Sequence, residues 1–284
     1  MSRRRWYSHV GRHTLLLIAV AFSLLPVLWV VSASFNATQS MQFQKLIPPN
    51  PTLDNYKTLF TSPQYKYGLW LWNSVKISLI TSTFVVALTA LAAYSFSRFR
   101  FKGRRVGLLG LLLVQMFPQM LAIVALYVLL LTMGHFFPFA GMNTHTGLIL
   151  IYLGGAMGFN TWLMKGYFDT IPRSLEESAK VDGATSFQAF TKILLPLVRP
   201  ILATIFVLTF ISIYSDFLIA SVMLRTAEQQ TIPVGLRVLI SDQYGTRWAL
   251  FSAGAVISAL PFLVVFLVAQ RSLVSGLTRG GVKE

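Results

Sequence analysis

The sequence predicts an all-α polytopic membrane protein, and its composition and apolar runs carry that prediction. Of the 284 residues, 55% are hydrophobic and only 12% are charged, whereas a soluble domain carries about 25% charged residues. So few charges cannot cover a water-facing surface, and so apolar a chain is not typical of disorder. The apolar runs are long and lack the alternation of barrel strands, so we expect helices.

Six segments are long and apolar enough to cross a hydrocarbon core of about 30 Å, which takes about 20 helical residues. Polar residues and prolines interrupt each one, so its ends are expected to shift by a few residues. The six predicted spans are Thr14–Phe35, Asn73–Ser97, Val106–Leu131, Thr146–Lys165, Pro200–Leu224 and Ala249–Gln270. They divide the chain into an N-terminus (1–13), the first span (14–35), an outer loop (36–72), spans two to four (73–165), an inner loop (166–199), the last two spans (200–270) with their outer loop (225–248), and a tail (271–284).

Lysine and arginine are distributed unequally over the connecting segments. If the N-terminus is inside, the inner segments hold 17 of the 24 basic residues and the outer loops hold six, with Lys76 at the edge of the second span. This bias predicts that both termini are cytoplasmic. It also accounts for the net charge of +15 without a nucleic-acid partner, which we do not expect.

The first apolar run admits two interpretations. Arg3–Arg5 before an apolar run, with Ser32–Ser34 near its end, resembles a signal peptide, and Ser2–Trp6 loosely resembles a twin-arginine signal. The run of about 20 residues exceeds the usual 7–15 of a signal peptide, and five more predicted spans follow. We therefore expect an uncleaved signal anchor.

No residue pattern supports a catalytic or metal site. Cysteine is absent, and none of the four histidines, His9, His13, His135 and His145, belongs to a zinc-binding pattern. No Gly-Lys dipeptide occurs, so the chain has no phosphate-binding loop of the G-x-x-x-x-G-K-[ST] type. If ATP drives this protein, another chain binds it, and we expect no cofactor on this one.

Polar residues inside the predicted spans are candidates for a transport pathway. Asp216 is the only acid inside a span, which makes it a functional candidate. A proton-coupled carrier would use such an acid, but Tyr214, Ser215 and a helix break could satisfy it. We favour a structural or gating role. Three further residues interrupt the third span and either line a pathway or form hydrogen bonds between helices: Gln115, Pro118 and Gln119.

The inner loop contains two helix-start patterns. Ser174 with Glu177 fits S-x-x-E, and Thr185 with Gln188 fits T-x-x-Q, the pattern of a capping box. Gly183 stands between them, where a residue after a helix end adopts a left-handed conformation. The predicted helices are Leu175–Asp182 and Ser186–Leu194.

The spacing of side chains in this hairpin is consistent with a docking surface. Glu176 and Lys180 have the favourable i,i+4 order of a surface ion pair, and Ala179 is small enough for a close approach. Phe187 and Phe190 are expected on one face, where they could fill a pocket. A solvated amphipathic hairpin lying on the membrane would have the same spacing.

The hairpin resembles the EAA loop of membrane subunits of ATP-binding-cassette (ABC) importers. The family pattern is E-A-A-x3-G-x9-I-x-L-P, and this chain departs from it only by a serine in place of the first alanine. The matching residues are Glu177, Ala179, Gly183, Ile193, Leu195 and Pro196, and Ser178 is the departure.

Other segments resemble the six-span membrane subunit of bacterial maltose/maltodextrin importers. They are Gln115–Pro118, Gly141–His145, Lys165–Phe168 and Gly276–Lys283. The similarity covers the chain from about Leu112 to the C-terminus and, more loosely, the N-terminal part. It implies a type I ABC importer permease fold in the bacterial cytoplasmic membrane.

The resemblance also implies partners and a substrate class. The partners are a second membrane permease subunit, an ATPase homodimer that binds Mg-ATP, an extracytoplasmic sugar-binding protein and membrane lipid. Maltose and maltodextrins are the implied substrates, with trehalose or another oligosaccharide as the alternative.

Residue roles carried over from the family concern three contact regions. In the hairpin, Glu177 would contact an ATPase arginine and Gly183 would allow the turn, while Phe187 belongs to the docking surface. The glycine-rich tail would reach into the ATPase interface through Gly280, Gly281 and Val282, unless it is simply a frayed terminus. A scoop that enters the binding protein would be formed by Gln243, Tyr244 and Gly245, although nearby Trp248 also fits an interfacial aromatic belt.

Two other functional classes compete with the importer subunit. A stand-alone secondary carrier would use Asp216, but the chain lacks an internal inverted repeat and the EAA pattern has no role in such a carrier. A membrane enzyme would need a nucleophile–base pair or a metal cluster, and no pattern supports one. The importer hypothesis predicts that the isolated chain does not transport.

Overall fold

The computed structural model describes residues 3–40, 45–241 and 246–280. Within these ranges the chain is built from helices, and the only β-type pairing is an isolated bridge between Asn36 and Pro51. This architecture confirms the predicted all-α class.

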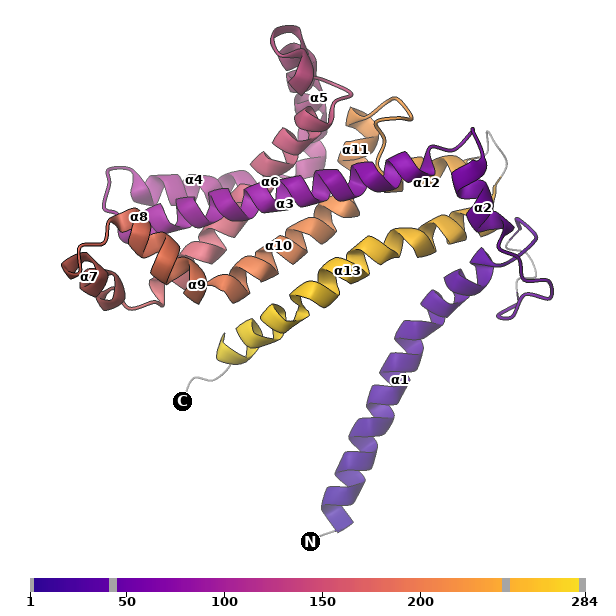
Figure 1. The fold of residues 1–284 in the computed structure, drawn as a ribbon, viewed down its shortest axis with the longest axis horizontal. Coiled ribbons are helices and arrows are strands. Elements are labelled where there is room, and N and C mark those ends of the chain that lie inside the picture. Colours follow the sequence, from indigo (N-terminus) through magenta and orange to yellow (C-terminus); the bar gives the residue numbers. More distant parts are fainter. Residues whose placement is uncertain (1–2, 41–44, 242–245, 281–284) are drawn as a thin grey trace. The chain divides into compact units, whose positions relative to one another are not determined.

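Four helices are long and apolar enough to cross a membrane unbroken. These spans lie in α1 (Arg3–Ser34), α3 (Tyr67–Arg98), α6 (His145–Asp169) and α13 (Trp248–Gly280) (Figure 1). Two bent pairs are further candidates: α4 (Arg104–Met116) with α5 (Gln119–Phe136), and Ser186–Leu197 with α10 (Arg199–Tyr214). Counting each pair as one span gives six among the described residues, in agreement with the predicted number.

The third and fifth predicted spans are not continuous helices, which corrects the sequence-based boundaries. α4 ends at Met116, and Phe117 turns to an extended conformation with ψ 127°. A proline disfavours helical backbone in the residue before it and has no N–H to donate, so Pro118 explains this break. The predicted fifth span is divided between α10 and the short helix α11 (Leu218–Met223).

The chain divides into two compact units. The first comprises residues 1–68 and 235–260. In it, α2 (Asp54–Thr61) supplies Leu59, which packs with Tyr67 against the backbone of Gly254 in α13. The Tyr67 hydroxyl also donates a 2.7 Å hydrogen bond to the Gly254 carbonyl. A glycine is needed there, because a Cβ at position 254 would lie 3.2 Å from the Tyr67 ring and closer still to Leu236.

The second unit comprises residues 69–234 and 261–284. Among its described residues, one apolar core lies around Met164, Phe168 and Phe190, and another around Ile77, Leu148 and Met223. The connection after α11 is tied to α3, since Trp70 and Asn73 donate hydrogen bonds to backbone carbonyls between residues 227 and 230. Further short elements are α12 (Ile232–Arg237) and two 3₁₀ turns, Pro138–Ala140 and Val238–Ile240, and the inner loop forms the helices described below.

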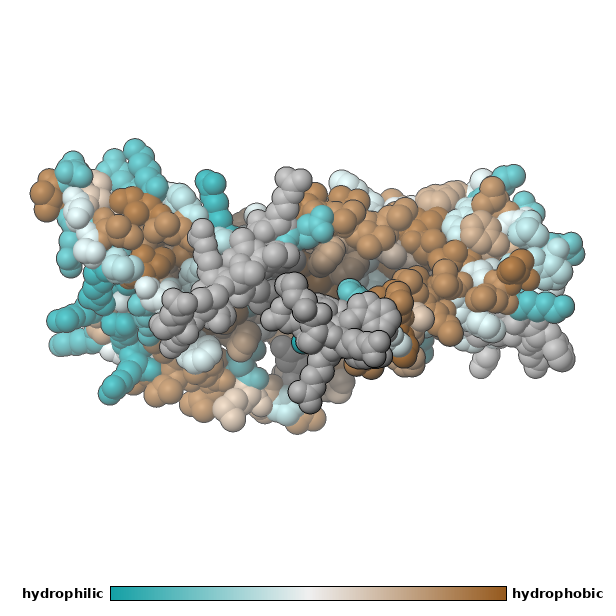
Figure 2. Space-filling model, turned by 90° about the horizontal axis from the view of Figure 1, so that it is seen from below, coloured by the Kyte–Doolittle hydropathy of each residue, from teal (hydrophilic) through white to brown (hydrophobic). Residues whose placement is uncertain are grey.

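Apolar side chains cover much of the molecular surface. Hydrophobic residues occupy a large part of the face seen in Figure 2, and hydrophilic residues gather in separate patches. In α1 the most apolar stretch has no buried residue within the structure. Such a surface is stable only in contact with lipid or with another protein, so the structure suits a polytopic membrane protein.

Candidate functional site

The inner loop folds into the helical hairpin expected from its sequence. Its first arm is α7 (Ser174–Val181); its second is α8 (Ser186–Ala189), which continues through a π-helical turn (Phe190–Leu194) into α9 (Leu195–Leu197). Gly183 has φ +85°. Its N–H bonds to the Lys180 carbonyl at 3.1 Å, and the next N–H bonds to the Ala179 carbonyl at 2.9 Å. This is a Schellman motif, and it confirms the predicted left-handed glycine.

Only one of the two predicted capping boxes is present. The Thr185 hydroxyl accepts from the Gln188 N–H at 3.2 Å, and the Gln188 side chain accepts from the Thr185 N–H at 2.8 Å. The box predicted at Ser174 is wrong. Ser174 is the first helical residue of α7, and the N–H groups of Glu176 and Glu177 both bond to the carbonyl of Arg173.

Glu176 turns inward and pairs with Arg98 at the end of α3. The two side chains are 6% and 7% exposed, respectively. The predicted surface pair between Glu176 and Lys180 is therefore wrong. Burial explains the difference: a desolvated carboxylate needs a close cationic partner, and Arg98 supplies one from another helix. The Tyr94 hydroxyl lies within donating distance of both Glu176, at 3.3 Å, and the Ser186 carbonyl, at 3.1 Å.

A polar network around Arg98 joins α3, α6 and the start of the hairpin. Arg98 Nη2 donates to the Ile171 carbonyl at 2.9 Å. The Ser97 hydroxyl donates to Asp169 Oδ1 at 2.6 Å, and Lys165 Nζ pairs with Asp169 Oδ2 at 2.5 Å. Arg173 Nη2 donates to the Ser97 carbonyl at 3.3 Å. We call Arg98, Glu176 and these partners the Arg98 network.

An apolar base lies beneath this network. Phe190 is buried and packs on Tyr94 and Phe168, with ring centroids 4.8 Å and 6.4 Å away. Phe187 is 66% exposed. The two rings are neighbours, with centroids 6.4 Å apart, which agrees with the predicted shared face. Only Phe187 is exposed enough to fill a pocket of a partner, because Phe190 anchors the second arm to the core.

The residues of the EAA pattern divide between an outer surface and the packing beneath it. Glu177, Ser178 and Gly183 are exposed, as is the adjacent Val181, which is 89% exposed. Ala179 is buried. Farther along the chain Ile193 and Leu195 are half-buried, and Pro196 is exposed. The hairpin surface formed by Glu177, Ser178, Val181, Gly183 and Phe187 combines one acid with two exposed apolar side chains.

Asp216 lies in the break between α10 and α11. Its Oδ1 atom accepts from the Tyr152 hydroxyl at 2.8 Å and from the Ala220 N–H, in the first turn of α11, at 3.0 Å. The Tyr152 hydroxyl comes from α6 and was not among the partners that the sequence suggested. The carboxylate thus provides a hydrogen-bond acceptor for a backbone N–H in the first turn of α11.

Gln115 forms a hydrogen bond between helices. Its Nε2 donates to the Gly155 carbonyl of α6 at 2.5 Å. A Cβ at nearby Gly158 would lie 3.0 Å from the Gln115 side chain, so α4 and α6 approach closely here. Pro118 is exposed at the break, and Gln119 is the first residue of α5.

Several residues expected at partner contacts lie outside the described residues. They are Gln243, Tyr244 and Gly245 of the predicted scoop, and Gly281 and Val282 of the tail. Gly280 is the last residue of α13.

Sequence reasoning missed the Arg98 network. By sequence, Arg98 is one of the basic residues that set orientation, and Glu176 is a surface residue. One signal was available: Arg98 directly follows an apolar span, and a basic residue there can serve either as a cytoplasmic anchor or as the partner of a buried acid.

Comparisons with known proteins place this hairpin and its helices in a family. Residues 86–279 match the model of the binding-protein-dependent transport system inner membrane component. A maltose/maltodextrin transport system permease protein of Vibrio vulnificus is 44% identical, and the match covers 99% of this chain and 96% of the relative. The Escherichia coli (strain K12) counterpart is also 44% identical, over 95% and 94% of the two chains.

Other relatives are named for the transport of other sugars. A galactooligosaccharides transport system permease protein of Bacillus subtilis is 43% identical over 100% of this chain and 98% of the relative. A solved bacterial ABC transporter involved in the import of alginate has the same fold, with TM-score 0.78 and 23% identity over 96% of this chain and 99% of that one. On the family match and these full-length relatives, the chain belongs to the binding-protein-dependent transport system inner membrane components.

Proposed function

We propose that this chain is a permease subunit of an ATP-driven importer for maltose and maltodextrins, and that its hairpin couples an ATPase to alternating access. The observation that carries the proposal is a capped hairpin that exposes Glu177, Val181 and Phe187 while the buried Arg98–Glu176 pair fastens it to α3. A capped, anchored element transmits a displacement as a rigid body, whereas a loose loop would absorb it.

In this proposal the hairpin surface docks into a cleft of the partner ATPase. Glu177 contacts a basic residue of the ATPase, and Phe187 and Val181 bury apolar area in the cleft. Aromatic and apolar anchors surrounded by polar groups are typical of energetically important contacts. When Mg-ATP closes the ATPase dimer, the hairpin moves with it, and the Arg98 network passes the displacement to α3 and α6.

Two further contacts complete the proposed assembly. Gly280, Gly281 and Val282 contact the ATPase dimer interface, and Gln243, Tyr244 and Gly245 enter the sugar-binding protein from the other side of the membrane. A second membrane subunit completes the pathway. ATP hydrolysis belongs to the partner, and both termini of this chain face the cytoplasm. One related fold supports such an assembly: an alginate transporter was solved in complex with a periplasmic protein bound to an alginate pentasaccharide.

The choice of sugar rests on the relatives. Maltose/maltodextrin permeases and a galactooligosaccharide permease match this chain almost equally, at 44% and 43% identity. We favour maltose and maltodextrins, because several maltose/maltodextrin relatives match over almost the full length. Trehalose or another oligosaccharide is the alternative.

The role of Asp216 is proposed to be structural or gating. Its carboxylate already accepts hydrogen bonds from Tyr152 and from Ala220 at the start of α11. These bonds hold the break between α10 and α11 in place, which suits a permease whose helices move as units.

Reversal of the charge of Glu177 tests the proposed coupling. Glu177→Lys is placed in the whole transporter, reconstituted in liposomes with the binding protein and maltose. We expect the transporter to assemble while sugar uptake and sugar-stimulated ATP hydrolysis fall to background. Asp182→Lys, which reverses the charge of the other exposed acid of the hairpin, is the matched control for charge alone. Normal uptake by Glu177→Lys would overturn the coupling role.

A further inference from the structure

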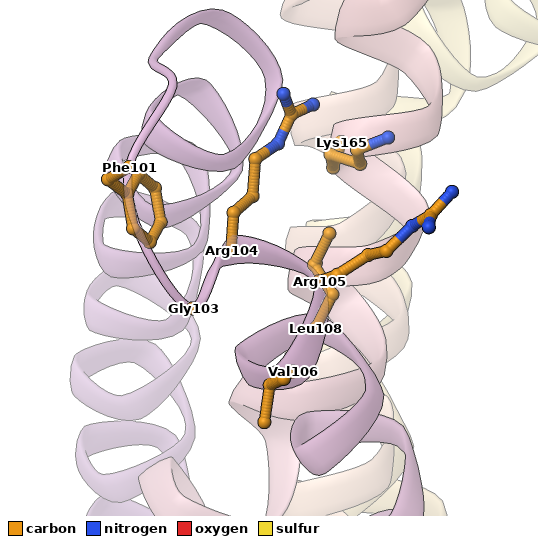
Figure 3. A pocket seen from close by; sticks show the side chains of 7 residues that line it. All are labelled: Phe101, Gly103, Arg104, Arg105, Val106, Leu108 and Lys165. Atoms are coloured by element: carbon orange, nitrogen blue, oxygen red, sulfur yellow. The ribbon is translucent and has the colours of Figure 1, made fainter.

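A basic pocket opens at the start of α4, outside the hairpin surface. Its volume is about 560 Å³. Arg104 and Arg105 reach it from the first turn of α4 and Lys165 from α6, with Phe101, Val106 and Leu108 on its apolar side. Figure 3 shows the long side chains of Arg104 and Arg105 extending from the start of α4 toward the helix that carries Lys165. A second pocket of about 460 Å³ shares Arg104 and borders the Arg98 network.

The connection between α3 and α4 carries an excess of positive charge, which the electrostatic interaction of Arg104 with Asp169 compensates only in part. From Phe99 to Arg105 it contains four basic residues and no acid. Arg98, just before it, is neutralised by Glu176, and Asp169 is engaged by Lys165 and Ser97. Neither the Arg104 nor the Arg105 guanidinium forms a hydrogen bond or an ion pair with any residue that the structure describes. Two arginines in the first turn of a helix also oppose the positive end of its dipole, so the local charge favours a bound anion.

An exposed apolar stripe begins at the same pocket. Val106, Leu109 and Leu113 follow i, i+3 and i+7 spacing along α4, and each is more than half exposed. A free inorganic anion would gain nothing from this stripe. An anion that carries acyl chains would contact both the basic pocket and the stripe.

We propose that this pocket binds the headgroup of an anionic phospholipid from the leaflet on the side of the hairpin. Arg104 and Arg105 hold the phosphate, Lys165 adds positive charge beside it while it remains paired with Asp169, and an acyl chain lies along Val106, Leu109 and Leu113. Basic clusters next to a membrane span recognise anionic headgroups through charge and hydrogen bonding. The bound lipid would fix the start of α4 beside the Arg98 network.

The test measures lipid retained on the purified full-length chain, with whatever subunits accompany it, by native mass spectrometry. The protein is delipidated in mild detergent and titrated with phosphatidylglycerol, with phosphatidylcholine of the same acyl chains, and with glycerol phosphate. The variant is Arg104→Gln/Arg105→Gln. Its matched control, Arg100→Gln/Lys102→Gln, removes the same charge from the same connection but leaves the pocket lining intact.

We expect one tightly retained phosphatidylglycerol per chain, lost in Arg104→Gln/Arg105→Gln and kept in the control. Phosphatidylcholine should not replace it, and glycerol phosphate should compete only at a concentration at least 100-fold higher. Equal loss in both variants would show diffuse charge attraction and overturn the site. If glycerol phosphate competes as well as the lipid, the pocket binds free anions and the proposed lipid site is overturned. Release of a protein subunit, with lipid retention unchanged, would mean that a protein covers the pocket. Because lipid retention does not depend on sugar or ATP, the test can fail without affecting the proposed transport function.

Discussion

At the residue scale, two adjacent glutamates occupy opposite environments. Glu176 is buried against Arg98, whereas Glu177 is exposed on the hairpin surface. Helical geometry separates neighbours by about 100°, so consecutive side chains diverge. The pair therefore offers a direct comparison between an acid that holds the hairpin and an acid proposed to bind a partner.

Removal of one member of the buried pair should destabilise the protein. Glu176→Gln leaves the Arg98 guanidinium without its counter-charge, and a broken buried pair costs about 3–5 kcal/mol. We expect a lower temperature at which the detergent-solubilised protein loses its monodisperse chromatographic peak. Glu177→Gln is the matched control and should leave that temperature unchanged. The double variant Arg98→Gln/Glu176→Gln should be less destabilised than the sum of the single variants. Strict additivity would argue against a direct interaction.

Gly183 should tolerate alanine poorly because of its backbone and not because of crowding. Its φ is +85°, and a Cβ added at this position would have no other atom within 4 Å. A left-handed conformation costs an alanine about 1–2 kcal/mol. Gly183→Ala is thus expected to loosen the hairpin and to lower sugar-stimulated ATP hydrolysis several-fold, with Gly183→Asn milder. Gly166→Ala is the control: it also has an open Cβ position but lies within α6. Equal activity of Gly183→Ala and Gly166→Ala would contradict this reasoning.

At the element scale, the helices are predictable where a local signal marks their ends. The turn of the hairpin can be recognised from a few neighbouring residues, namely Gly183 and the Thr185–Gln188 box. Pro118 likewise marks a break in the third span. The break after Tyr214 contains no proline or glycine. It depends on the hydrogen bonds of Asp216 to Tyr152, 64 residues earlier, and to Ala220. Mean hydropathy is calculated over one short segment, so it contains no information about a hydrogen bond between residues 64 positions apart.

The candidate site shows the same limit. The exposed residues of the hairpin could be predicted because they form a pattern along the chain. The Arg98–Glu176 pair could not, since its members are 78 residues apart and meet only when α3 packs beside the hairpin. The burial of Phe190 could not be predicted for a related reason: its neighbours Tyr94 and Phe168 come from α3 and α6.

The substitution Asp216→Asn distinguishes a structural role of this acid from a role in proton transfer. Asp216→Asn retains an oxygen that can accept from Tyr152 and from the Ala220 N–H, but it cannot be deprotonated. If the acid holds the break between α10 and α11, uptake by Asp216→Asn should stay within a few-fold of the parent protein, and Asp216→Leu should lose it. The measurement is sugar uptake into liposomes with and without a pH gradient. Loss of uptake in both variants, together with dependence on the gradient in the parent, would favour a proton relay.

At the scale of the whole molecule, exposed apolar surface and dependence on partners belong together. The apolar stretch of α1 buries nothing within the structure, and the hairpin exposes Val181 and Phe187. Lipid can cover the first of these surfaces. The second lies beside charged and polar groups such as Glu177, so a protein partner suits it better than the bilayer core. The fold thus combines a surface suited to lipid with a hairpin surface that we propose docks a partner, and the described residues contain no group of three or more His, Cys, Asp or Glu that could hold a metal ion.

The tagged chain, purified in mild detergent from its native host, should therefore bring a second polytopic subunit and an ATPase in two copies. The measurement is the mass and stoichiometry of the purified assembly. Phe187→Asp should release the ATPase while retaining the membrane partner, because it places a charge at the centre of the proposed contact. Phe139→Asp, which adds the same charge at an equally exposed phenylalanine outside the hairpin, is the control for added charge. A chain that purifies alone and still transports sugar would refute the importer assignment and return attention to Asp216. An intact assembly whose ATP hydrolysis responds to a galactooligosaccharide-loaded binding protein, and not to a maltose-loaded one, would keep the coupling role and change only the substrate.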